Sequence, residues 1–138
     1  MNRRIGQVAL AASDRRRSTA FYAQVFGLSR VFGTAEFRGP EVDRVQAMEK
    51  AASSTDWLMD DRDLFQLEIF EFEHPQSRPL PADHGLHDEG YNRLIVAVKD
   101  LDVTCNAAVA CGGTLVALLC EQDPSGPEKA LLRDPDGI

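Results

Sequence analysis

Residues 5–14 read IGQVALAASD, a short apolar run that ends in Ser13 and Asp14, two residue types that cap helices well. The run has the length and the β-branched residues of a strand. Residues 15–26 then carry Ala20, Phe21, Ala23 and Val25 and stop at Gly27, which predicts a helix of about three turns with a glycine stop. The N-terminal part of the chain is therefore predicted to be a strand that leads directly into a helix.

The same pattern returns in residues 91–102, which read YNRLIVAVKDLD. Gln7 stands seven residues before Asp14, and Arg93 stands seven residues before Asp100. In both places an apolar strand ends at an aspartate that opens a helix. Since a repeated order of elements marks duplicated units, we interpret the chain as two related halves.

The stretch LFQLEIFEF at 64–72 is the clearest further strand. Its alternation places Leu67 and Ile69 on one face of the strand. Four side chains fall on the opposite face, and they are Gln66, Glu68, Phe70 and Phe72. Further strands are predicted at 28–37, 57–59, 114–120 and 128–133, and residues 42–50 are ambiguous between a helix and a strand.

A linker separates the two halves. Residues 74–90 contain three prolines and two glycines and show no periodicity. The sequence DRDL at 61–64 matches DPDG at 134–137, and each follows a short apolar strand. We therefore predict one domain over residues 1–138, which consists of a first module at about 4–73, the linker, and a second module at about 91–138.

The composition narrows the partners and the location of the protein. The chain of 138 residues carries 22 acidic and 15 basic residues, for a formal net charge of −7. Such an acidic surface disfavours binding to nucleic acids or anionic membranes, and no apolar run approaches the ~20 residues that span a bilayer. The cysteines Cys105, Cys111 and Cys120 fit no zinc-binding spacing and indicate reduced thiols, so we expect a cytoplasmic protein.

The repeated unit resembles those of the vicinal oxygen chelate superfamily, which includes glyoxalase I, bleomycin-resistance proteins, fosfomycin-resistance enzymes and extradiol dioxygenases. The resemblance covers nearly the whole chain and rests on IGQVALAASD, FYAQVFGL, LFQLEIFEF, YNRLIVAVKDLD and LLRDPDG. It implies an α+β fold in which two tandem βαβββ modules form a curved mixed sheet around a ligand cavity, here with the last strand of the second module missing. We also expect a homodimer.

The resemblance also implies which residues face the cavity. In that superfamily, the ligands of a divalent metal come from the first and the last strand of each module, and the matching positions here are Gln7, Glu68 and Arg93. The fourth position would lie seven residues after Asp134, beyond Ile138. For this missing strand we favour a truncated sequence over an omitted tail or a strand donated by a partner chain.

Arg93 is the departure from the superfamily that matters most for function. A guanidinium is always protonated and has no lone pair for a cation. Gln7 and Glu68 alone make a weak site, because hard divalent ions take about six oxygen ligands. We therefore expect no resident cofactor. The alternative is a bound divalent metal, which would be Mn, Ni, Zn or Fe. Arg93 either forms an ion pair with Glu68 or anchors the carboxylate or phosphate of a ligand.

Three functions are compatible with these residues. The one that we favour is a protein like the bleomycin-resistance proteins, which binds a small apolar or anionic molecule. Its ligand-binding residues would be Gln7, Arg93, Trp57, Phe70 and Phe72. The alternative is a metal-dependent lyase, isomerase or dioxygenase of the glyoxalase I type, with Glu68 as the catalytic residue. The third is a structural protein whose role is dimerisation.

Overall fold

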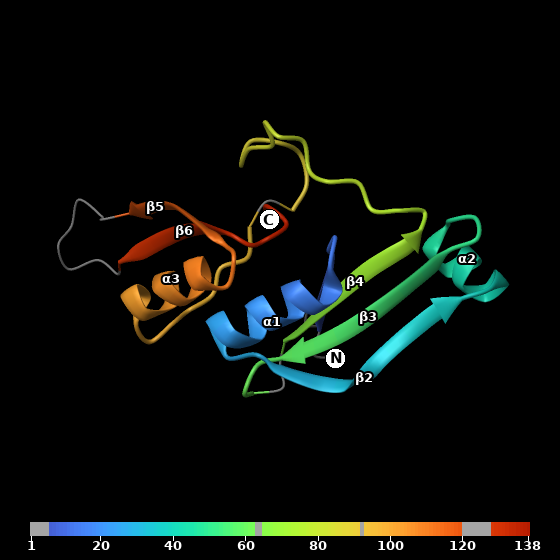
Figure 1. The fold of residues 1–138 in the computed structure, drawn as a ribbon, viewed down its shortest axis with the longest axis horizontal. Coiled ribbons are helices and arrows are strands. Elements are labelled where there is room, and N and C mark those ends of the chain that lie inside the picture. Colours follow the sequence, from blue (N-terminus) through green and yellow to red (C-terminus); the bar gives the residue numbers. More distant parts are fainter. Residues whose placement is uncertain (1–5, 63–64, 92, 120–127) are drawn as a thin grey trace, which may run out of the picture.

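The computed structural model of the chain describes residues 6–62, 65–91, 93–119 and 128–138. Its first half is a four-stranded sheet, here called sheet A, with two helices (Figure 1). The strands are β1 (Gln7–Ala11), β2 (Ser29–Arg38), β3 (Ala52–Met59) and β4 (Gln66–His74), and the helices are α1 (Arg15–Phe26) and α2 (Pro40–Gln46). The strand order is β1-β4-β3-β2. Because β1 runs parallel to β4 and the other neighbours are antiparallel, the predicted mixed sheet is confirmed.

Helix α1 begins and ends where the sequence predicts. The Asp14 carboxylate accepts the backbone N–H of Arg17 at 3.0 Å. Gly27 closes the helix in the left-handed conformation with a φ of 69°, which glycine adopts without a steric penalty. The apolar side of α1 packs on one face of sheet A and forms the core with it (Figure 1). The buried core residues are Ala12, Phe21, Tyr22, Val25, Leu58, Leu67, Ile69 and Ala108.

The strands of sheet A direct successive side chains to opposite faces, as the period of a β-strand requires. Leu67 and Ile69 of β4 are fully buried in the core that α1 covers. Glu68, Phe70 and Phe72 therefore lie on the other face of the sheet. The alternation that the sequence predicts for this strand is confirmed, and it leaves one face of sheet A for function.

The second half is smaller and lies beside the first (Figure 1). It contains α3 (Leu101–Ala110), β5 (Thr114–Leu119) and β6 (Lys129–Arg133), and its two strands pair antiparallel. The Asp100 carboxylate accepts the N–H of Val103 at 2.9 Å, which repeats the cap of α1. Helix α3 contacts α1, and its Ala108 is fully buried in the shared core. No helix of the described residues is long and apolar enough to cross a membrane.

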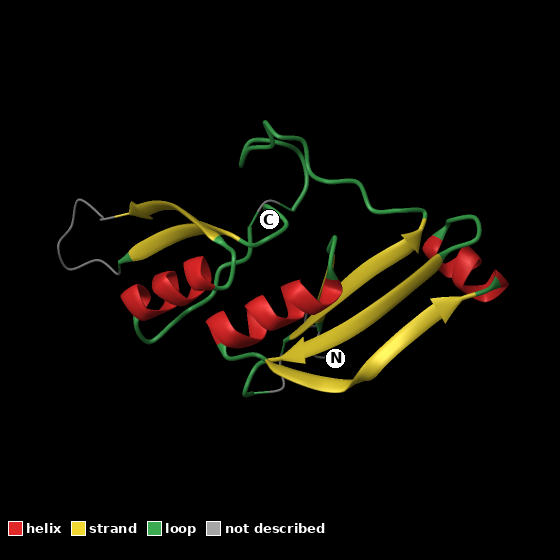
Figure 2. Cartoon of the chain, in the orientation of Figure 1, coloured by secondary structure: helices red, strands yellow, loops and turns green. Residues whose placement is uncertain are grey.

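The predicted strand at 91–98 is wrong. The described residues of this stretch belong to the loop that connects β4 to α3 (Figure 2), and Ile95 is 87% exposed. A strand needs a neighbour for its backbone N–H and C=O groups, and β1 finds that neighbour in β4. Among the described residues, no strand of the second half takes the place beside 93–98 that β4 takes beside β1. An apolar run without a partner strand therefore remains a loop.

Two shorter predictions also change in the structure. Strand β3 is longer than the predicted 57–59, because the small and polar residues 52–56 pair with β2 on one side and β4 on the other. The ambiguous stretch 42–50 is helical only to Gln46, since Ala47 ends α2 in the left-handed conformation. Cys120 and the last two residues of the DRDL stretch lie outside the described residues.

The DPDG turn at 134–137 joins the two halves. The Tyr22 hydroxyl of α1 donates to Asp134 Oδ2 at 2.8 Å. The Ser18 hydroxyl, also from α1, donates to Asp136 Oδ2 at 2.6 Å. Burial raises the pKa of the Asp134 carboxyl, and hydrogen bonds from the turn and from Tyr22 act against this rise. The DPDG turn, which is part of the family resemblance, therefore connects the second half to α1 of the first half.

Gly113, between α3 and β5, has no room for a side chain. A Cβ atom there would lie 2.7 Å from the Phe21 ring and 2.8 Å from the carbonyl oxygen of Arg133. Because that carbonyl belongs to β6, the clash requires a backbone shift. We expect Gly113→Ala to lower the free energy of unfolding by about 1–3 kcal/mol in chemical denaturation. Gly33→Ala is the control, since nothing lies within 4 Å of a Cβ atom at Gly33, and equal losses in both variants would contradict the prediction.

Candidate functional site

Four aromatic side chains gather on the face of sheet A that is opposite to the core. The ring centre of Phe37 on β2 lies 6.4 Å from that of Trp57 on β3 and 6.1 Å from that of Phe70 on β4. Phe70 in turn stacks on Phe72 at 5.5 Å. We call these four residues the aromatic face. Each is only partly buried, so together they offer apolar surface to a ligand.

Glu68 lies at one end of the aromatic face. It is directly opposite Trp57 in the β3–β4 register and is 8% exposed. The Gln7 amide donates a hydrogen bond to its carboxylate, and Trp57 donates a second one. Burial raises the pKa of the Glu68 carboxyl, and the hydrogen bonds from Trp57 and Gln7 partly oppose this rise. The site therefore holds one carboxyl group in a fixed position at the edge of an apolar surface.

A pocket of about 380 Å³ opens between α2 and the aromatic face. Its lining residues are Phe37, Glu41, Val42, Val45, Gln46 and Phe70. The Oε1 atom of Gln46 is buried and has no hydrogen-bond partner among the described residues. The volume lies within the range of small-molecule sites.

The structure brings most of the predicted site residues together. Gln7, Trp57 and Glu68 form one hydrogen-bonded group, and Phe70 and Phe72 continue from it along β4. Arg93 is exposed in the loop between β4 and α3 and is not among the residues that line the pocket. The contacts of Glu68 are with Gln7 and Trp57, so the ion pair that was one of the two roles for Arg93 does not form. Whether each of these residues binds a ligand stays a prediction.

The family model described as the glyoxalase/bleomycin resistance protein/dioxygenase superfamily matches residues 4–138. The chain belongs to this superfamily. No curated protein sequence matches the chain. The assignment agrees with the resemblance that the sequence suggested, and it applies to both halves of this glyoxalase-superfamily protein.

Solved structures support the same fold for this glyoxalase-superfamily protein. A glyoxalase family protein from Bacillus cereus is similar with a TM-score of 0.87 at 18% sequence identity, over 98% of this chain and 89% of that one. A point mutant of the fosfomycin resistance protein FosX from Listeria monocytogenes, solved with Mn(II) and a dihydroxypropylphosphonic acid, is similar with a TM-score of 0.61 at 12% identity. That match covers 99% of this chain and 88% of FosX. At these identities the likeness shows the fold alone.

Among the described residues, the side chains at the superfamily's metal positions do not fit a divalent metal. Gln7 and Glu68 offer two protein ligands, where a hard divalent ion takes about six oxygens, and the Gln7 amide already donates to Glu68. Within the described ranges, no three His, Cys, Asp or Glu side chains lie close enough together to hold a metal ion. These residues therefore do not form a complete metal site by themselves.

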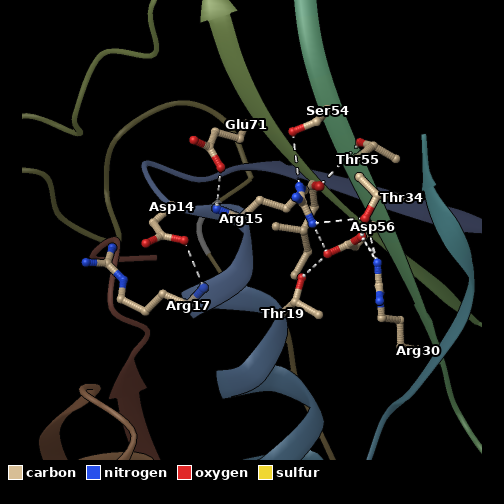
Figure 3. A network of polar contacts seen from close by, with 11 residues as sticks. Asp14, Arg15, Arg17, Thr19, Arg30, Thr34, Ser54, Thr55, Asp56 and Glu71 are labelled. Atoms are coloured by element: carbon tan, nitrogen blue, oxygen red, sulfur yellow. Dashed lines mark hydrogen bonds and ion pairs between the residues drawn. The ribbon is translucent and has the colours of Figure 1, made fainter. Parts of the chain in front are cut away.

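A polar cluster that the sequence did not reveal supports the site from the opposite face of sheet A. Asp56 on β3 forms ion pairs with Arg15 of α1 and with Arg30 of β2, the latter at 2.7 Å (Figure 3). The Thr34 hydroxyl of β2 also donates to Asp56, at 2.9 Å. The cluster joins α1 to the two strands that carry Trp57 and Phe37. No local pattern predicts it, because Asp56 and Arg15 are far apart in the sequence.

The sequence also missed the residues that α2 contributes. Phe37 stands in a predicted strand, but only the strand order places its ring against Trp57 and Phe70. Val42 and Gln46 stand in the stretch that was ambiguous between a helix and a strand. The one available signal was Pro40 followed by Glu41, which is typical of a helix start. Their role in a pocket depends on where α2 packs.

Proposed function

We propose that this protein binds a small apolar molecule on the aromatic face, as a superfamily member without a complete metal site. The observation that carries the proposal is the run of ring contacts from Trp57 through Phe37 and Phe70 to Phe72, beside a pocket of about 380 Å³. Apolar surface removed from water contributes roughly 25 cal/mol per Å², so partly exposed rings next to a pocket favour an apolar ligand. Glu68 supplies a polar contact that orients it.

Binding of the neutral apolar dye Nile red tests this proposal. Trp57 is the single tryptophan of the chain, so energy transfer from it to the dye reports binding close to the aromatic face. We expect Phe70→Ala to weaken this binding by about tenfold, because it removes a ring that contacts Phe37 and Phe72 and lines the pocket. The expected affinity of Tyr91→Ala is that of the parent, since Tyr91 is fully exposed in the connecting loop.

Two results would contradict the proposal. One is the absence of energy transfer from Trp57 to the dye in the parent protein. The other is an equal affinity of Phe70→Ala and Tyr91→Ala, which would place the dye away from the aromatic face. The same titration with EDTA or with added Mn²⁺ is expected to give an unchanged affinity. A strict requirement for the metal would favour the metal-dependent enzyme instead.

A further inference from the structure

Two carboxylates flank the aromatic face. Glu68 stands at one end of the face, and Glu41 lines the pocket at the other end. Glu41 has Arg44 at 3.7 Å, but both side chains are largely exposed, and such a pair contributes little. Arg93, for which the sequence left open an ion pair with Glu68 or a role as the anchor of an anion, lies in the connecting loop and is not among the residues that line the pocket. A ligand on this face therefore meets carboxylates.

The Glu68 carboxylate has room for a further hydrogen bond. Glu68 receives hydrogen bonds from Gln7 and Trp57, and a carboxylate accepts about four, so it has capacity for a donor from a ligand. That position accepts an N–H or O–H group and not the oxygen of an anion.

The spacing along β4 allows one molecule to use both ends of the site. Glu68 and Phe70 are two residues apart on the same face of the strand, which is about 7 Å. Phe70 also lines the α2 pocket. A flat ring that stacks on Phe70 and enters the pocket can thus extend a short polar arm to Glu68. The nearby Trp57 ring adds a surface that attracts cations through its π-electrons.

From this geometry, and resting on the proposed function above, we propose that the aromatic face selects flat aromatic ligands that carry a cationic amine. The ring lies on Phe70 with one edge toward Val42 in the α2 pocket. The amine reaches the Glu68 carboxylate, where a charge-assisted hydrogen bond forms. An anionic group in the same place would lie against the buried Glu68 carboxylate. None of the described residues that line the aromatic face and the pocket is basic, so none of them would neutralise that group.

Three naphthalene compounds of nearly equal size test the selection by isothermal titration calorimetry at physiological salt. They are 2-naphthylmethylamine, which is cationic, 2-naphthylmethanol, which is neutral, and 2-naphthoate, which is anionic. We expect the amine to bind at least about tenfold more tightly than the alcohol, and the carboxylate to bind most weakly. Carboxylate binding that equals or exceeds amine binding would overturn the proposal.

Charge variants separate a local effect from the net charge of the protein. Glu68→Gln keeps the shape and an acceptor for Gln7 and Trp57, and we expect it to reduce the advantage of the amine over the alcohol to less than about threefold. Glu73→Gln removes one charge from the opposite face of β4, and we expect it to leave that advantage unchanged. Equal effects of the two variants would overturn the role of Glu68. Circular dichroism checks that both variants are folded. Glu41→Gln changes an exposed side chain, so it does not threaten the fold, and we expect it to reduce the advantage of the amine over the alcohol by less than Glu68→Gln does.

The two proposals fail in different ways. Equal affinity for the amine and the alcohol, with Nile red still bound next to Trp57, would overturn the charge selection and leave the apolar binding function in place. No binding of Nile red or of any naphthalene compound would overturn both.

Discussion

Asp56→Ala is expected to lower the free energy of unfolding by about 3–5 kcal/mol, because it leaves the buried Arg15 guanidinium without its carboxylate. Asp56 is 2% exposed and lies between α1 and sheet A. It receives hydrogen bonds from Arg15, from Arg30 at 2.7 Å and from Thr19 at 3.1 Å (Figure 3). Chemical denaturation followed by Trp57 fluorescence measures the loss. A change below about 1 kcal/mol would show that Arg15 finds another partner or reaches water.

The same variant has a predicted pH signature. Burial raises the pKa of Asp56, but hydrogen bonds from Arg30, Thr34 and Arg15 outweigh burial and hold this pKa below its usual value. A carboxyl group whose pKa is lower in the folded state stabilises the protein above its unfolded pKa of about 4. This contribution is lost as the pH falls through the folded pKa. We therefore expect the parent to lose stability below about pH 4 more steeply than Asp56→Ala does.

The control for Asp56 is an ion pair in an exposed position. Glu73 pairs with Arg38 at 2.6 Å, and both side chains are about half exposed. Solvent screens such a pair, so Glu73→Gln is expected to leave the midpoint of denaturation almost unchanged. A loss from Glu73→Gln as large as that from Asp56→Ala would mean that charge removal, and not the buried position, causes the effect.

Phe21→Ala is the second large expected loss, at about 3–5 kcal/mol. Phe21 is 2% exposed and contacts Tyr22 and Phe26 edge-on, with ring centres at 5.3 and 6.1 Å. Its ring also fills the space where a Cβ atom of Gly113 would be. Since Phe21 sits between sheet A and the second half, its removal leaves a cavity where the halves meet.

The readout follows both halves at once. Trp57 fluorescence reports sheet A, and the accessibility of the buried Cys105 thiol on α3 reports the second half. We expect both signals to shift together to lower denaturant concentration in Phe21→Ala. Phe32→Ala makes the same change at a ring that is 75% exposed and is expected to have little effect. A shift in only one signal would mean that the halves unfold independently.

The local parts of this fold were predictable because they depend on neighbours in sequence. Asp14 and Asp100 cap their helices through backbone N–H groups three residues away. The alternation along β4 follows from the two-residue period of a strand, so the common face of Glu68, Phe70 and Phe72 needed no knowledge of the rest of the chain.

The stretch at 91–98 is a case in which prediction from neighbouring residues fails. Its composition is that of a strand, but a strand forms only with a partner for its backbone groups. Local composition does not show whether that partner exists. One of the two roles predicted for Arg93, the ion pair with Glu68, depended on this strand and was lost together with it.

By itself, then, the sequence determined the caps, the alternation and the family of this protein, since these depend on short-range patterns that residues 4–138 carry. Only the tertiary structure decided the site. The order β1-β4-β3-β2 places Gln7 beside Glu68, and it sets the Phe37 ring against Trp57 and Phe70. The packing of α2 against the aromatic face forms the pocket. The buried ion pair between Asp56 and Arg15 holds sheet A against α1 on the opposite face. These contacts join residues far apart in the chain, and only the packing of the whole sheet brings them within reach.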